Sequence, residues 1–373
     1  MGISDSVLKY DEKAIYQLRE LYSRFGYMRY KVSKFEEYDL YARNKSFLVS
    51  KNILTFTDTD GRLMALKPDV TLSIIKNADD AEMHKVYYNE NVYRTSAAAD
   101  GFREIVQTGL ECIGKIDLYS MSEVIMLAQK SLDIISPDNI LDLSHMGFVL
   151  GLLDNLGIEG VDADTLVDHI GHKNIPAIKA FCAEHRIFEA ECEELCKLTC
   201  LYAPIEQALM AIAGMVRGEK MREAYEQLSG ICKVLSQLVD TSRIYLDFST
   251  VNDMNYYNGI TFRGFVKGIP DGVLSGGRYD TLMHKMGKSS GAIGFAVYLD
   301  MLQRLSLNAS EYDVDNLVIY DEDTDELLLA KTLSEIGERG ESFRAQTNAN
   351  TALRAKKTFR ITREGVQSIE GND

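Results

Sequence analysis

The stretch VYYNENVYRTSAAADGFREIVQTGLECIG, from Val86 to Gly114, decides the class of fold. Its two ends, Val86–Arg94 and Val106–Ile113, are rich in β-branched and aromatic residues, and the turn sequence Ala98-Ala99-Asp100-Gly101 lies between them. Two such runs around a turn that ends in glycine are typical of a β-hairpin. This hairpin predicts strands that pair in an antiparallel sheet.

A second pair of strand-like runs comes before the first. Ile53–Thr57 and Arg62–Leu66 lie on either side of Asp58-Thr59-Asp60-Gly61, so we expect these two hairpins to supply four strands of an antiparallel sheet. Nearer the start of the chain, apolar residues at helical spacing predict an amphipathic helix that begins near Asp11 and ends before Gly26. This helix should pack on the sheet.

The whole chain fits an α+β fold in two parts. Residues 1–307 would form an antiparallel sheet flanked by helices, interrupted by a helical insertion at about residues 142–240. Residues 308–373 would form a short C-terminal α/β segment. Strand patterns return after the insertion at Ile244–Phe248, Ile260–Phe265, Gly272–Leu274 and Gly291–Leu302, the last turning into a helix. The C-terminal segment shows a strand, a helix and a strand at Asn316–Tyr320, Glu326–Gly340 and Ser342–Ala345.

Composition excludes several classes of protein. The 373 residues are 46% hydrophobic and 26% charged, as in a globular protein with a large core, and the net charge of −15 disfavours extended nucleic-acid binding. No apolar run approaches the roughly 20 residues that span a bilayer. The start of the chain lacks the apolar core of a signal peptide, and the six cysteines form no disulfide framework, so we expect a cytoplasmic protein with reduced thiols.

Common cofactor and metal motifs are missing. The sequence contains no GxxxxGK(S/T), GxGxxG or HExxH string, which removes the usual support for phosphate-loop, dinucleotide or zinc-protease chemistry. Cys192, Cys196 and Cys200 form one helical stripe, which favours packing in a core over a zinc or redox site. We expect neither a cofactor nor a metal ion.

Polar residues gather on segments that otherwise have the pattern of buried strands. They are Asp69, Thr71, Gln107, Glu111, Tyr256 and Tyr257. Buried carboxylates are costly unless they meet a cation or several donors. Two acids, an amide and two tyrosines could hold an ammonium group and an imidazole. A purely structural polar network is the other interpretation, and spacing alone does not decide between them.

Several long strings resemble the catalytic domain of histidyl-tRNA synthetase, a class II aminoacyl-tRNA synthetase. They occur in the same order and together cover most of residues 5–305. The strings are TFTDTDGRLMALKPDVT (Thr55–Thr71), VYRTSAAADGFREIVQTGLECIG (Val92–Gly114), MNYYNGITF (Met254–Phe262), SGGRYDTLMHKMG (Ser275–Gly287) and GAIGFAVYLDML (Gly291–Leu302). The resemblance implies a class II antiparallel sheet that carries a histidine pocket.

The resemblance also assigns a histidine-binding set. Asp69 and Thr71 match the acid and threonine that hold the ammonium group of the amino acid, and Gln107 and Glu111 match the QxGxE string. Tyr257 and Tyr279 match the tyrosines near the imidazole. The pocket therefore resembles one that still binds histidine.

The residues that activate histidine in the synthetase do not match. Asn252 stands where the family has an arginine that assists attack on the α-phosphate, and Met301 stands where the motif 3 arginine grips the γ-phosphate. Motif 2 keeps Arg94, but Ser96 replaces its acid and the ATP loop reads Ala97-Ala98-Ala99. Ser33 takes the place of the motif 1 proline. Because each lost phosphate contact is typically worth about 3 kcal/mol in a transition state, we expect no adenylation.

A histidine pocket without the ATP arginines resembles the regulatory subunits of ATP phosphoribosyltransferase. The resemblance implies a subunit without catalysis of its own that permits the activity of a short-form catalytic subunit. It also implies feedback inhibition by L-histidine in the first step of histidine biosynthesis. Because class II domains pair across motif 1, we expect a homodimer core within a hetero-oligomer, and no membrane partner.

Two alternatives stay open. A divergent histidyl-tRNA synthetase would need replacement arginines, for which Arg263 and Arg278 are the nearby candidates. A degenerate synthetase paralogue could instead bind another partner or amino acid. A short basic run near the C-terminus is expected to be solvated or to face a partner rather than tRNA, and it consists of Arg354, Lys356, Lys357, Arg360 and Arg363.

Overall fold

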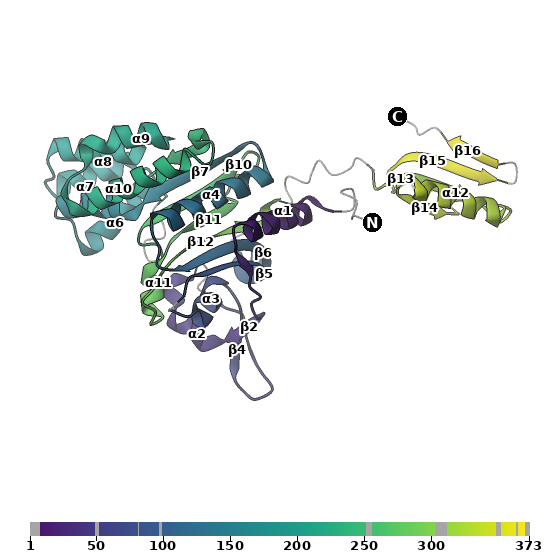
Figure 1. Cartoon of the computed structure of the whole chain (residues 1–373), viewed down its shortest axis with the longest axis horizontal. Coiled ribbons are helices and arrows are strands. Elements are labelled where there is room, and N and C mark those ends of the chain that lie inside the picture. Colours follow the sequence, from purple (N-terminus) through teal and green to yellow (C-terminus); the bar gives the residue numbers. More distant parts are fainter. Residues whose placement is uncertain are drawn as a thin grey trace. The chain divides into compact units, whose positions relative to one another are not determined.

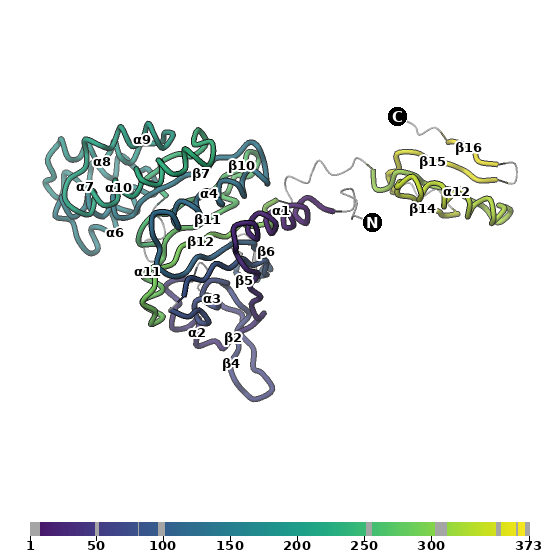
Figure 2. The backbone as a smooth tube through the Cα atoms, in the orientation of Figure 1, coloured from purple at the N-terminus to yellow at the C-terminus, as the bar shows by residue number. Residues whose placement is uncertain are grey.

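The computed structural model describes residues 8–48, 52–80, 82–96, 99–250, 256–302, 312–347, 352–362 and 365–369. The chain divides into two compact units, Met1–Leu305 and Ser306–Asp373, and its path can be followed in Figures 1 and 2. The expected boundary after residue 307 falls outside the described residues.

A nine-stranded sheet forms the centre of the first unit, in the order β1-β5-β6-β12-β11-β10-β7-β9-β8. The pairs β1–β5 and β7–β9 are parallel and the other pairs are antiparallel. The strands are β1 (Met28–Arg29), β5 (His84–Ser96), β6 (Ala99–Gly114), β7 (Asn139–His145), β8 (Ala203–Pro204), β9 (Ile244–Leu246), β10 (Ile260–Val266), β11 (Leu274–Arg278) and β12 (Gly291–Tyr298). The predicted α+β class is confirmed, and β5 and β6 are the long hairpin predicted from Val86–Gly114.

The other predicted hairpin lies in a different sheet, which corrects the expectation that it adds to the first. β3 (Thr55–Thr57) and β4 (Leu63–Leu66) pair with each other, and β4 pairs on its other edge with β2 (Phe35–Glu37). The chain then enters α3 (Thr71–Asn77) before it reaches β5. Because β2 occupies the free edge of β4, these strands form their own three-stranded sheet.

The expected strand at Gly272–Leu274 is displaced along the chain. β11 runs from Leu274 to Arg278 and includes Gly276 and Gly277. A Cβ atom on Gly276 would clash with the carbonyl oxygen of Gly294 on β12, so these glycines permit a close approach of neighbouring backbones.

Two helices cover one face of the large sheet. α1 (Tyr10–Arg24) is the predicted amphipathic helix, and it buries Ala14, Leu18 and Tyr22. α4 (Leu118–Ile135) packs against α1 and against strands β7, β10 and β12. The shorter helices α2 (Tyr38–Arg43) and α11 (Asp280–Lys285) belong to the part of the unit near β2 and β4 in Figure 1.

Helices predominate between β7 and β9, where the sequence predicts an insertion. They are α5 (Met146–Asn155), α6 (Gly160–Gly171), α7 (Ile175–Glu184), α8 (Glu189–Cys200), α9 (Ile205–Ile212) and α10 (Gly218–Leu235). On α8, Cys192 and Cys196 pack partly buried against the core, whereas Cys200 is exposed. The part of the chain that the structure describes holds no helix able to cross a membrane and no group of three metal-ligating side chains.

The second unit is a four-stranded sheet in the order β14-β13-β15-β16 with one helix, α12 (Glu326–Glu338). The strands are β13 (Val314–Tyr320), β14 (Phe343–Gln346), β15 (Ala355–Thr362) and β16 (Gly365–Ile369). The hairpin β15–β16 is absent from the sequence prediction, because β15 carries most of the basic run and shows little apolar alternation. Arg354 pairs with Asp313, and Arg363 lies outside the described residues.

Candidate functional site

Strand alternation on β6 brings Gln107 and Glu111 to the same face of the large sheet. Across the strand pair, Glu111 stands opposite Gly294 and Gln107 opposite Tyr298 on β12. A Cβ atom on Gly294 would overlap the carboxylate of Glu111, so only glycine leaves that side chain room to lie across the sheet. Gly294 and Glu111 both line a cavity on this face of the sheet.

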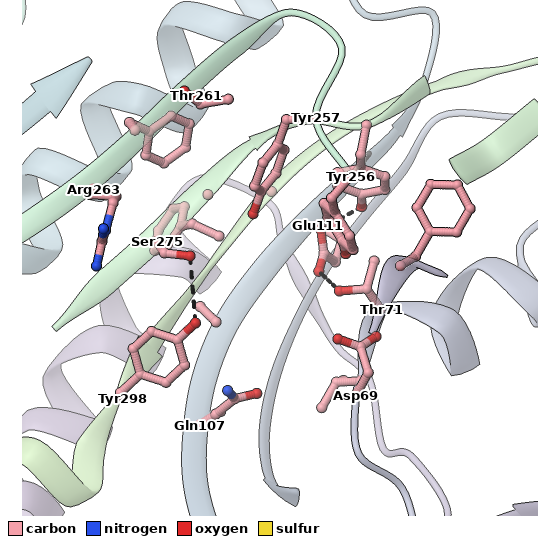
Figure 3. Close-up of a pocket in the computed structure, with 18 of the residues that line it drawn as sticks. Asp69, Thr71, Gln107, Glu111, Tyr256, Tyr257, Thr261, Arg263, Ser275 and Tyr298 are labelled. Carbon is pink, nitrogen blue, oxygen red and sulfur yellow. Dashed lines mark hydrogen bonds between the residues drawn. The ribbon is translucent and has the colours of Figure 1, made fainter. Parts of the chain in front are cut away.

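The cavity has a volume of about 460 Å³. Its lining includes all six residues of the predicted histidine-binding set, namely Asp69, Thr71, Gln107, Glu111, Tyr257 and Tyr279. Figure 3 shows Thr71 and Glu111 close together, with Tyr256 and Tyr257 beside them and Asp69 below. The structure therefore brings together residues that lie on four separate segments of the sequence.

Glu111 is the centre of the polar contacts. The hydroxyl of Thr71 donates a hydrogen bond of 2.7 Å to Oε1, and the hydroxyl of Tyr279 donates one of 2.5 Å to Oε2. Burial raises the pKa of Glu111 to about 8, although these two hydrogen bonds lower it, and the nearby charge of Asp69 raises it further. Burial therefore disfavours the charged form of this carboxyl group, and a cationic ligand would favour it.

Asp69 is the second acid of the cavity. Its carboxylate accepts a hydrogen bond of 3.0 Å from the backbone N–H of Leu72 in the first turn of α3. Burial raises the pKa of Asp69, while the guanidinium of Arg94, at 4.0 Å, lowers it. Arg94 is itself buried and donates from Nε to the carbonyl oxygen of Pro68 at 2.8 Å. Arg94 thus positions the loop that carries Asp69.

Tyrosine rings form one wall of the cavity. The ring centroids of Tyr256 and Tyr257 are 4.7 Å apart, and those of Tyr256 and Tyr279 are 5.7 Å apart. These rings offer flat faces to an imidazole or an ammonium group. The sequence prediction missed two further tyrosines that line the cavity, Tyr88 and Tyr298. Only the strand register reveals them, because it sets Tyr298 opposite Gln107 and Tyr88 opposite Gly109.

The structure describes only some of the positions that are predicted to have lost the catalytic residues of the synthetase. Met301 is partly buried and packs against the hydrophobic core, where it offers no charge to a phosphate. Asn252, like Met254, Asn255, Ala97 and Ala98, lies outside the described residues. Ser33, at the motif 1 proline position, is exposed.

The two candidate replacement arginines face opposite sides of the sheet. Arg263 lines the main cavity. Arg278 is excluded from it, because it pairs with Asp280 at 2.8 Å and lines a second cavity of about 340 Å³ together with His145 and Lys220. Successive residues of a strand point to opposite faces, and Arg278 follows Gly277, which lies on the face of the main cavity.

The sequence profile described as histidyl-tRNA synthetase matches residues 5–302. An ATP phosphoribosyltransferase regulatory subunit from Caldanaerobacter subterraneus subsp. tengcongensis is 32% identical, over 76% of this chain and 75% of that protein. Another, from Thermoanaerobacter pseudethanolicus, is 30% identical over 82% of this chain and 81% of that protein.

Solved structures agree on the fold. An ATP phosphoribosyltransferase regulatory subunit/histidyl-tRNA synthetase from Bacillus halodurans superposes with a TM-score of 0.72 at 22% identity, over 92% of this chain and 90% of that one. A chain of the ATP phosphoribosyl transferase complex from Thermotoga maritima gives 0.61 at 18% identity, over 78% and 97%. The resemblance predicted from the sequence is confirmed: the chain belongs to the family of ATP phosphoribosyltransferase regulatory subunits, and its first unit is a histidyl-tRNA synthetase-like domain.

Proposed function

We propose that this regulatory subunit binds L-histidine in the main cavity, has no catalysis of its own, and transmits feedback inhibition to a short-form catalytic subunit. The observation that carries the proposal is the carboxyl group of Glu111, which Thr71 and Tyr279 hold from two sides at the floor of the cavity. The relatives named as regulatory subunits support the setting in histidine biosynthesis.

The charges of the cavity suit histidine. The charge of Asp69 raises the pKa of Glu111, and the guanidinium of Arg94 lies 4.0 Å from the carboxylate of Asp69. An α-ammonium group would relieve this repulsion and restore the charge of Glu111. The rings of Tyr256, Tyr257 and Tyr279 would enclose the imidazole, and Gln107 would meet the polar backbone atoms of the ligand.

Within the described residues, the positions that would hold the phosphates of ATP are replaced or already engaged. Met301 brings a thioether where the synthetase has an arginine, and Arg94 is already engaged with Pro68 and Asp69. The phosphates of ATP would therefore find few fixed cations here, and transition-state charge would go uncompensated. A pocket that binds an end product without transforming it acts as a sensor.

Inhibition would follow from linkage between two binding sites. If the complex with the catalytic subunit has an active and an inactive state, histidine shifts their populations only by its difference in affinity for the two. We propose a homodimer core within a hetero-oligomer, in the cytoplasm, as the setting for this equilibrium. The exposed Ser33 segment is the motif 1 position at which the dimer would form.

Reconstitution tests the proposal. The purified chain is mixed with a short-form catalytic subunit, and phosphoribosyl transfer to ATP is measured with and without L-histidine. We expect transfer that depends on this chain and that histidine inhibits. The chain alone is assayed in parallel for histidine-dependent ATP–pyrophosphate exchange. Exchange without any effect on the catalytic subunit would identify a divergent synthetase instead.

A further inference from the structure

Three cysteines meet in the helical insertion. Cys182 lies on α7, whereas Cys192 and Cys196 lie one helical turn apart on α8. The two helices follow each other in the chain and pack together (Figure 1). The thiol of Cys182 is in hydrogen-bonding contact with the thiol of Cys192, which also contacts that of Cys196. We call these three residues the thiol cluster.

The turn between α7 and α8 sets which residues face each other. The backbone N–H of Ile187 donates to the carbonyl oxygen of Cys182 at 2.9 Å, and Arg186 has a φ of 55°, so the chain reverses at the end of α7. In the first turn of α8, the backbone N–H of Cys192 donates to the carbonyl oxygen of Phe188 at 3.0 Å. Cys182 and Cys192 stand equally far along the chain from Ile187, one on each helix. They therefore form the layer of this helical hairpin that lies next to its turn.

The two thiols differ in their access to solvent. Cys182 is 2% exposed, whereas Cys192 is half-buried. Burial raises the pKa of the Cys182 thiol to about 12, and the hydrogen bond to Cys192 raises it further. Because the thiolate is the nucleophile in thiol–disulfide exchange, Cys182 is poorly suited to begin such a reaction. A small reagent in solution would reach Cys192 first, with Cys182 directly behind it.

Two other roles account less well for the thiol cluster. A zinc ion is held by three or four protein ligands, and the described residues contain no group of three that could hold a metal ion. Packing explains why a single cysteine is buried, as at Cys232 on α10, which is 7% exposed. Packing gives no reason for thiols of two helices to meet, and contact between two thiols is what a disulfide requires.

We propose that Cys182 and Cys192 form a thiol–disulfide exchange site, at which a small disulfide such as oxidised glutathione converts the two thiols into a disulfide that joins α7 to α8. The site belongs to the helical insertion. Among the described residues, none of those that line the main cavity comes from α7 or α8. The exchange site therefore does not depend on the binding of histidine.

The exchange proceeds in two steps. The thiolate of Cys192 attacks one sulfur of oxidised glutathione, so the S–S bond of the reagent breaks and one glutathione leaves. The sulfur of Cys182 then attacks the sulfur of Cys192 in this mixed disulfide, and the second glutathione leaves. The chain gives up two protons and two electrons, which the two molecules of reduced glutathione carry away. The new bond holds the ends of α7 and α8 together across their turn.

Mass spectrometry of the full chain tests the site. The chain is equilibrated with mixtures of reduced and oxidised glutathione, quenched with acid, alkylated with N-ethylmaleimide and digested with trypsin. Trypsin cleaves after Arg186, which puts Cys182 on one peptide and Cys192 with Cys196 on the next. We expect these two peptides to be joined by a disulfide, with the thiol of Cys196 alkylated.

Alanine variants identify the bond. Cys192→Ala should lower the yield of the joined peptides at least tenfold, although Cys196 remains on the same peptide, and Cys196→Ala is its matched control and should keep the yield of the wild type. Cys182→Ala should lower the total disulfide content of the chain at least tenfold. Cys232→Ala, which removes a buried cysteine of α10, should leave that content unchanged. The thermal midpoint of each reduced variant reports whether it folds.

Three results would overturn the proposal. A disulfide between Cys192 and Cys196, or loss of the joined peptides in Cys196→Ala alone, would show that the wrong pair is assigned. Glutathione bound to single cysteines without any joined peptides would show that Cys182 does not complete the exchange. A wild-type chain that stays fully reduced in excess oxidised glutathione would show that the cluster serves packing. None of these results affects the histidine proposal, which the reconstituted complex tests separately.

Discussion

The hydroxyl of Tyr279 lies 2.5 Å from Oε2 of Glu111, although 168 residues separate the two in the sequence. Tyr279 is the residue before α11, whereas Glu111 lies in the middle of the sheet on β6. Thr71 holds the other oxygen of Glu111 from the first turn of α3. The carboxyl group is therefore oriented by two neutral donors, and no cation of the described residues pairs with it, which leaves the ligand to supply one.

Glu111→Gln should weaken binding of L-histidine at least tenfold while the fold is kept. The amide has nearly the shape of the carboxyl group but cannot carry the charge that an ammonium group favours. Calorimetry with L-histidine measures the effect. Glu104→Gln is the matched control, because Glu104 is an exposed glutamate on the same strand. Equal affinity in wild type and Glu111→Gln would mean that histidine binds elsewhere.

The stability of the ligand-free chain should fall between about pH 4.5 and about pH 8. The ordinary pKa of the Glu111 carboxyl is 4.5 and burial raises it to about 8, so in this window the folded state binds more protons than the unfolded state. The stabilising contribution of the protonated group is complete below the lower value and is lost as the pH rises toward the upper one. The slope from this group is at most about 1.4 kcal/mol per pH unit.

Urea unfolding at a series of pH values measures this slope. Glu111→Gln should flatten the profile, because the amide does not titrate. Asp142 has a pKa raised to about 7 by burial and should add a slope of the same sign, which Asp142→Asn would remove. A wild-type profile that rises across the window would contradict the assignment of raised pKa values to these two acids.

Lys67→Met should destabilise the first unit by about 3–5 kcal/mol. Lys67 is 1% exposed and its Nζ lies 2.6 Å from Oε2 of Glu90, so the substitution leaves a carboxylate in a buried place without its cation. Arg43→Gln breaks the exposed pair with Asp39 and should change stability by less than about 1 kcal/mol. Urea unfolding compares the two, and similar losses would show that the buried pair is better solvated than its geometry indicates.

Gly294→Ala should abolish histidine binding and lower the unfolding free energy by about 1–3 kcal/mol. The added methyl group would overlap Oε2 of Glu111 and press on the carbonyl oxygen of Leu110. Gly214→Ala is the control, because a Cβ atom there meets no neighbour within 4 Å. Calorimetry and thermal unfolding give the two readouts. Normal histidine affinity in Gly294→Ala would place the ligand away from Glu111.

Local sequence pattern was enough to predict the strands with strong alternation of apolar and polar residues and the helix with apolar residues at helical spacing. The hairpin of β5 and β6 and the helix α1 follow from residues that are close in sequence. Alternation along β6 also predicts that Gln107 and Glu111 share a face. The β15–β16 hairpin was not predicted because charged side chains occupy many of its positions. The hairpin of β3 and β4 was predicted to join the large sheet, which was wrong, because strand pairing depends on distant segments.

By itself the sequence determined the family, the class of fold and the residue types of the cavity, because these depend on long strings and on periodicity. Tertiary structure alone decided which groups meet. The register of β12 on β6 sets Gly294 against Glu111, and the faces of β10 and β11 place Arg263 inside the main cavity and Arg278 outside it. Contacts across a sheet depend on pairing between distant segments, and a shift of one residue would reverse every side chain of a strand.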